Sequence, residues 1–157
     1  QFGYQSFKTR SPPRNSRRAK VAAIYQFVEQ HVDYLGIEFG IGAYQPRPAK
    51  ATLARAKGDC KDMTLIMILL MRSINITAYP AAVRTRVLGN IPTDVPSLAP
   101  FDHSIVYLPK EKRWLDTTTK EIIYPLLPPN IQGRPALIMT PSGGILTTTS
   151  RSTHSQN

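Results

Sequence analysis

The only cysteine of the chain, Cys60, lies in the segment Gly58-Asp59-Cys60-Lys61-Asp62, directly before a mostly apolar run over residues 63–71. Such a run predicts a buried helix, which would place the thiol on the first turn. One cysteine has no partner for a disulfide and cannot hold a zinc ion alone. At a helix N-terminus, the unpaired N–H groups and the macrodipole favour the thiolate over the thiol. Cys60 is therefore a candidate nucleophile, and the alternative is an inert packing cysteine.

A cysteine nucleophile needs a base, and the base needs a group that orients it. Of the three histidines, His154 lies in the polar C-terminal tail and His31 at the end of a predicted helix, where a histidine commonly caps carbonyl groups. His103 opens a predicted strand after a proline-rich loop. His103 is therefore the candidate base, and the alternative is a structural histidine.

The strand over residues 103–108 is followed by Pro109-Lys110-Glu111-Lys112 and by a second predicted strand over 113–116. If these four residues form the turn of a hairpin, side chains alternate so that His103 and Asp116 share one face, with roughly 5–8 Å between their Cβ atoms. A register slip of one residue would place them on opposite faces. Within reach of the imidazole, Asp116 could accept a hydrogen bond from one ring nitrogen.

These three residues together would support nucleophilic chemistry at a carbonyl carbon. Cys60 would attack, His103 would hold the proton and return it to the leaving group, and Asp116 would fix the tautomer of the imidazole and stabilise its charged form. Such a site needs no metal and no organic cofactor. Two other interpretations stay open: Asp116 as the cap of a turn, and the charges of Lys61 and Asp62 as a solvated first turn.

The elements that would position these residues are helices in the first half of the chain and strands in the second. The passage over 33–48 is broken by glycine and proline, with one short strand expected over 37–39. Asp59 is predicted as the N-cap of the cysteine helix, and Asn15 or Ser16 as the cap of the first helix. The predicted helices cover 16–31, 49–56 and 60–74, and the predicted strands 81–87, 103–108, 113–116, 136–140 and 145–149. This order indicates an α+β fold with a mostly antiparallel sheet packed on a central helix that begins at the cysteine.

The composition sets limits on the function. A chain of 157 residues with 41% hydrophobic residues is long enough for one domain with a core, and no apolar run reaches the ~18 residues needed to cross a bilayer. The net charge of +10 would suit an anionic lipid surface or an acidic polymer. Specific nucleic-acid binding is disfavoured, because no zinc-finger spacing, aromatic RNA-binding strand or long basic helix is present. The chain begins with Gln1, so we expect a processed form or an excised fragment.

Five segments resemble bacterial transglutaminase-like proteins. They are Tyr34-Leu35-Gly36-Ile37-Glu38-Phe39-Gly40, Gly42-Ala43-Tyr44-Gln45-Pro46, Gly58-Asp59-Cys60-Lys61-Asp62, Phe101-Asp102-His103-Ser104-Ile105-Val106 and Trp114-Leu115-Asp116-Thr117-Thr118. The resemblance covers about residues 15–125. It implies a papain-like fold and a Cys-His-Asp triad, carried over to Cys60, His103 and Asp116. One donor to an oxyanion would be the backbone N–H of Cys60, and Tyr34, Tyr44 and Gln45 are all candidates for a second.

The resemblance also implies an organisation and a function. Residues 1–15 would be a linker, 16–125 the catalytic core, and 126–157 a connector and terminal hairpin leading toward a following domain. We expect cysteine-dependent acyl transfer or amide hydrolysis on peptide or protein substrates, in the periplasm or cell envelope and beside flanking domains of a larger chain. The alternative is a catalytically idle module that binds a peptide or an envelope polymer on the same fold.

Overall fold

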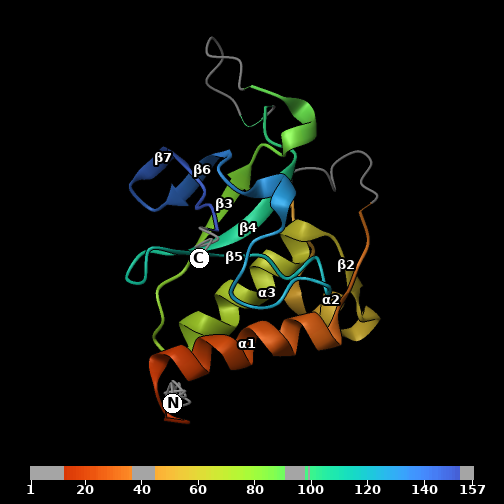
Figure 1. Cartoon of the computed structure of the whole chain (residues 1–157). Helices are drawn as coiled ribbons and strands as arrows, with labels where there is room; N and C mark the ends of the chain where they lie inside the picture. Colours follow the sequence, from red (N-terminus) through yellow and green to blue (C-terminus); the bar gives the residue numbers. More distant parts are fainter. Residues whose placement is uncertain (1–12, 37–44, 91–97, 99, 153–157) are drawn as a thin grey trace, which may run out of the picture.

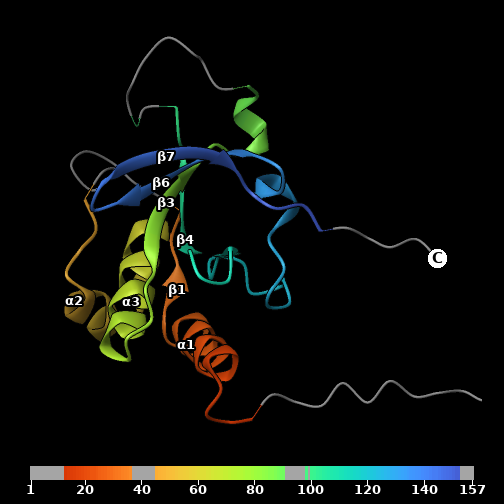
Figure 2. The ribbon, with the colours of Figure 1, turned by 90° about the vertical axis from the view of Figure 1, so that its left-hand side faces the viewer.

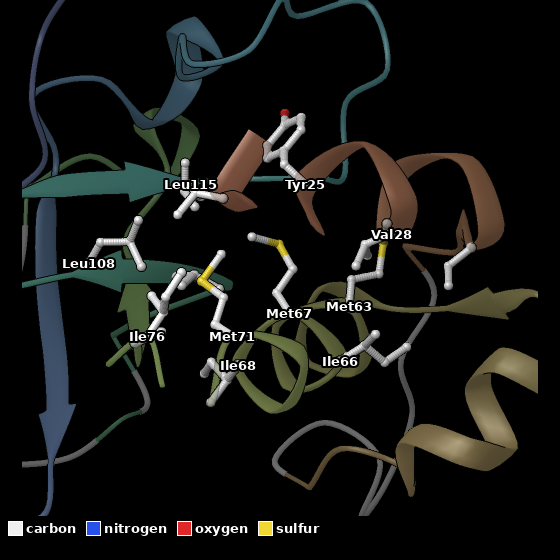
Figure 3. Close-up of a cluster of buried hydrophobic side chains, with 14 residues drawn as sticks. Tyr25, Val28, Met63, Ile66, Met67, Ile68, Met71, Ile76, Leu108 and Leu115 are labelled. Carbon is white, nitrogen blue, oxygen red and sulfur yellow. The ribbon is translucent and has the colours of Figure 1, made fainter. Parts of the chain in front are cut away.

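Helix α3 (Cys60–Ser73) is the centre of the fold, as its apolar sequence predicts. A computed structural model of the chain describes residues 13–36, 45–90, 98 and 100–152 (Figure 1). The α3 side chains Met63, Met67 and Met71 are at most 1% exposed. Figure 3 shows Met67 and Met63 toward Tyr25 and Val28, and Met71 toward Leu108 and Leu115. Burial of these side chains fixes the direction of α3 and therefore the position of its first residue.

Helix α1 (Arg17–His31) covers α3 on the side away from the hairpin that the last two strands of the chain form (Figure 1 and Figure 2). Of the two predicted caps, Ser16 is the one found, and its side chain accepts a hydrogen bond from the Ala19 N–H at 3.1 Å. His31 bonds the Phe27 carbonyl through Nδ1 at 2.8 Å, which confirms its place at the helix end. The bounds of α1 thus agree with the helix predicted over 16–31.

The predicted antiparallel sheet is confirmed, with the strand order β5-β4-β3-β6-β7 and antiparallel pairing throughout. Its strands are β3 (Tyr79–Val83), β4 (His103–Leu108), β5 (Arg113–Leu115), β6 (Pro135–Thr140) and β7 (Gly143–Thr148). Val106, Leu108 and Leu115 pack with α3 in one core cluster. Ile105 and Trp114 belong to a second cluster, which the connector over 125–134 helps to cover. The fold is therefore α+β, with α3 against one face of a five-stranded sheet.

The expected strand over 81–87 is wrong in its bounds, since β3 begins earlier and ends at Val83. Beyond this point the backbone leaves the sheet, because the Thr85 N–H donates to the Asp102 carboxylate at 2.7 Å. A short 3-10 helix follows over Arg86–Leu88. The chain is thereby directed into the loop that leads to His103.

Two very short strands form a separate parallel pair that the sequence pattern did not indicate. Strand β1 (Asp33–Tyr34) lies beside β2 (Lys57–Gly58), with Tyr34 opposite Gly58. The Leu35 N–H continues the pairing by donating to the Gly58 carbonyl at 2.8 Å. Helix α2 (Ala49–Arg55) leads into β2 through Ala56 in the left-handed conformation. This pair holds Tyr34 next to the segment that enters α3. The expected strand over 37–39 lies outside the described residues.

None of the helices in the described part of the chain combines the length and the apolar character that a membrane crossing requires.

Candidate active site

Asp59 caps the helix that Cys60 begins, as predicted. Its carboxylate accepts hydrogen bonds from the N–H groups of Lys61 at 2.8 Å and Asp62 at 3.1 Å, while Asp62 accepts from the Asp59 N–H at 3.2 Å. This reciprocal pair is a capping box. Cys60 itself is partly exposed and free. The cap fixes the first turn without using the cysteine side chain, which stays available for chemistry.

The glycine before this cap is required by packing. A Cβ atom added to Gly58 would lie 2.7 Å from Thr52 Cγ2 and 2.8 Å from Asp62 Cβ, closer than real Cβ contacts come. The segment Gly58-Asp59-Cys60 therefore lies tight against α2 and the first turn of α3.

The interpretation of Lys61 and Asp62 as solvated charges is wrong. The Asp62 side chain is fully buried and accepts from the Arg47 backbone N–H at 2.7 Å and from Arg47 Nη1 at 2.8 Å. Lys61 is only 12% exposed in its side chain, and its Nζ lies 2.9 Å from Asp59 Oδ2. Sequence reasoning missed Arg47, because the residue precedes Asp62 by 15 positions and belongs to a different element. A buried acid at the start of an apolar helix was the one available signal that a cation was needed.

The predicted hairpin register is confirmed, with Leu108 opposite Arg113 and Tyr107 opposite Trp114. His103 and Asp116 consequently meet, and His103 Nε2 lies 2.8 Å from Asp116 Oδ2. Both side chains are nearly buried, at 10% and 2% exposure. A four-residue turn places His103 and Asp116 on the same face, and in this position the carboxylate can orient the imidazole ring.

The carboxylate of Asp116 is held by further hydrogen bonds. Its Oδ1 accepts from the Thr118 N–H at 2.9 Å and from the Thr118 hydroxyl at 2.7 Å. The main chain of Asp116 is fixed as well, because the Tyr25 hydroxyl of α1 donates to its carbonyl at 2.6 Å. Asp116 thus caps a turn and also contacts His103, so the two interpretations left open by the sequence hold together. Tyr25 was missed, since nothing in the sequence relates it to a residue 91 positions away.

The imidazole of His103 also interacts with Cys60. Burial alone would lower the pKa of His103, but the hydrogen bond and charge of Asp116, followed by those of Cys60, outweigh burial and raise it to about 10. Burial raises the pKa of Asp116, yet the His103 charge and the hydrogen bonds from His103 and Thr118 bring it below its usual value. Both shifts favour an imidazolium next to a carboxylate. Because Nε2 of His103 contacts Asp116, Nδ1 is the ring nitrogen that can bond the Cys60 sulfur.

These shifts predict that part of the folding stability depends on the charge of His103. Because its folded-state pKa of about 10 lies above the unfolded value of 6.5, the contribution is complete below pH 6.5 and is lost as the pH rises toward 10. Urea unfolding of the wild type and of His103→Gln should therefore show a difference in free energy that shrinks over this range, by on the order of a few kcal/mol. A difference that stays constant or grows with pH would contradict the assignment.

The three candidates for the second oxyanion donor differ in their positions. The pKa of Tyr34 is raised to about 12, first by burial and then by the charges of Cys60, Asp116, Asp59 and Asp102. Its hydroxyl therefore lies among the groups of the site, although the residue as a whole is 40% exposed. Gln45 is exposed two residues before Arg47, and Tyr44 lies outside the described residues. Of the two candidates that the structure describes, Tyr34 is the one whose hydroxyl feels the charges of Cys60 and Asp116.

An α+β fold in which a cysteine begins the central helix, with a histidine on a neighbouring strand and an aspartate directly after the next one, defines a papain-like class of protein. The chain belongs to the transglutaminase-like superfamily, whose family model matches residues 5–115. A solved structure from Parabacteroides distasonis, described as that of a "putative protease", superposes with a TM-score of 0.64 at 16% sequence identity. The superposition covers 85% of this chain and 24% of that one, so the chain spans about a quarter of its structural neighbour. A search of curated proteins gives no match.

Proposed function

We propose that this domain catalyses cysteine-dependent acyl transfer or amide hydrolysis on peptide or protein substrates, with Cys60 as nucleophile, His103 as acid and base, and Asp116 as the group that orients the imidazole. The observation that carries the proposal is one connected series of interactions. It runs from Cys60 through the His103 ring to Asp116 and ends at Thr118. The description of the structural neighbour as a "putative protease" supports a peptide as the substrate.

The chemistry follows from this arrangement. The Cys60 thiolate attacks the carbonyl carbon of an amide, and the electron pair of the C=O bond moves to the oxygen. As the C–N bond breaks, the His103 imidazolium gives its proton to the leaving amine, and a thioester with Cys60 remains. Water or an amine then attacks the thioester carbon and loses its proton to His103. The C–S bond breaks with its electron pair leaving on the sulfur, which releases the acid or the new amide and restores the thiolate. Exclusion of water decides between hydrolysis and transfer.

The reactivity of the thiol tests this proposal directly. Iodoacetamide should alkylate Cys60 of the native protein at about pH 6–7 faster than it alkylates free cysteine, whose thiol has a pKa of ~8.5. The chain has a single cysteine, so the modification is read without ambiguity by mass spectrometry. Alkylation that is slow at neutral pH and equals that of free cysteine only above about pH 8 would favour a catalytically idle binding module.

We also propose the Tyr34 hydroxyl as the second oxyanion donor, beside the Cys60 backbone N–H. Replacing Tyr34 with phenylalanine removes one donor and should lower kcat about 10²-fold, with little change in KM or in the unfolding temperature. Tyr79→Phe on β3 is the matched control, since that half-buried tyrosine pairs with Tyr107, at the end of β4 opposite to His103. An unchanged kcat for Tyr34→Phe would exclude this role.

A further inference from the structure

The first turn of α3 holds two carboxylates beside the proposed nucleophile. Asp59 precedes Cys60 directly, and Asp62 follows it by two positions on the same turn. Both are removed from solvent, at 4% and 0% exposure. The negative charges of these two carboxylates oppose the formation of a further anion on the neighbouring sulfur. A reactive thiolate at this place therefore requires that both charges be compensated.

The compensation comes from two cations. Arg47 Nη1 lies 2.8 Å from Asp62 Oδ2 and 3.6 Å from Asp59 Oδ2, so that one guanidinium serves both acids. Lys61 Nζ lies 2.9 Å from the same oxygen of Asp59. Two carboxylates and two cations leave the start of the helix without net side-chain charge. The helix dipole and the imidazolium of His103 can then act on the sulfur unopposed.

Arg47 differs from Lys61 in its origin and in its exposure. It precedes α2, and its backbone N–H also donates to Asp62, so it ties the segment before α2 to the start of α3. Its side chain is 45% exposed, whereas the carboxylate that it contacts is fully buried. Among these two cations and two carboxylates, Arg47 is therefore the one that solvent, or a bound substrate, can reach readily.

We infer that Arg47 is a positioning residue for the reaction, which balances the charges of Asp59 and Asp62 so that Cys60 reacts as a thiolate. The inference rests on the proposed function, because it assigns Arg47 a role in the reactivity of the same cysteine. Other charged or titratable groups face the site from several elements: Asp59, Lys61 and Asp62 at the start of α3, His103 of β4, Asp116 after β5, Tyr34 of β1, and Asp102 before β4. Arg47 is distinguished among them by contacting both carboxylates of the helix start.

The test uses the rate of iodoacetamide alkylation at pH 7 and its dependence on pH. Arg47→Gln should lower the rate at pH 7 about tenfold and move the alkylation profile to higher pH, because two carboxylates then share one cation. Arg47→Lys, which keeps the charge, should stay within about threefold of the wild type. Asp62→Asn leaves an unbalanced cation and should alkylate faster than the wild type. The Asn oxygen can still accept the Asp59 N–H, which preserves the capping box, while its NH2 group replaces the oxygen that accepts the Arg47 backbone N–H.

The double variant Arg47→Gln with Asp62→Asn separates charge balance from a purely structural role. It should return the rate to within about threefold of the wild type, because one acid and one cation are removed together. Arg55→Gln, which removes an exposed cation on α2, is the matched control and should leave the rate unchanged. A folded double variant that alkylates tenfold more slowly than the wild type would overturn the inference. An Arg47→Gln variant with the wild-type rate and profile would do so as well.

Loss of Arg47 leaves a buried carboxylate without its partner and could unfold the single variant. In that case Asp62→Asn decides the question: faster alkylation than the wild type supports charge balance, and an unchanged rate overturns it. Failure of this inference and failure of the proposed function give different results. If wild-type Cys60 reacts no faster than free cysteine, the proposed function fails, whereas a reactive wild type that is insensitive to these substitutions removes only the role of Arg47.

Discussion

Replacement of Cys60 by alanine is expected to abolish amide hydrolysis and acyl transfer, with a loss of about 10⁴-fold or more in kcat. No other side chain near His103 in the described residues is a thiol, so the covalent step has no substitute nucleophile. The rate is measured as release of amine from a peptide library. The assay is then repeated with an added primary amine, so that acyl transfer to this amine can be detected.

The same variant should keep its fold. Asp59, rather than Cys60, caps the helix, and alanine is the best helix former at the first position of α3. The thermal unfolding midpoint should therefore stay close to that of the wild type. Unfolding of the variant would mark Cys60 as a packing residue, and full turnover by a folded variant would remove it from the mechanism.

The second large effect is expected for Asp116→Asn, with a fall in kcat of about 10³–10⁴-fold. The Asn carbonyl oxygen can still accept the two hydrogen bonds from Thr118, so the turn stays capped. Its amide group then faces His103 Nε2 as a donor. This places the proton of the neutral ring on Nδ1 and leaves the imidazolium without a counter-ion. The ring can then no longer receive a proton from the sulfur.

Two measurements distinguish this effect from a general loss of structure. The pH profile of Cys60 alkylation should change in Asp116→Asn, while the free energy of unfolding near neutral pH should fall by no more than the few kcal/mol that His103→Gln loses there. Asp102→Asn is the matched control, because Asp102 is the acid adjacent to His103 in sequence but its carboxylate accepts from Thr85. Equal losses of kcat in both variants would argue against a specific role for Asp116.

The parts of the molecule that could be predicted are those that depend on neighbours in the sequence. The helix caps at Ser16 and Asp59 follow from local side-chain chemistry. The contact between His103 and Asp116 follows from the length of one turn, since a four-residue connection fixes which residues of the two strands share a face.

The parts that could not be predicted depend on contacts between distant segments. A parallel pair of two-residue strands has no period that a pattern could show, so β1 and β2 were missed. The partner of Asp62 was missed because an arginine before one helix gives no sign that it will compensate an acid at the start of the next. The bounds of β3 depend on a side chain, Asp102, that captures a backbone donor of Thr85 in place of a strand partner.

The position of β6 in the sheet has a consequence for how the domain can be divided. Ala81, Ala82 and Val83 of β3 pair with β4 on one side and with Ile138, Leu137 and Ala136 of β6 on the other. A chain shortened to end near residue 125 would leave this side of β3 as an open, apolar sheet edge. Open edges of this kind recruit strands from other molecules. A soluble, monomeric preparation of the domain should therefore keep residues 135–148, although the match to the family ends at residue 115.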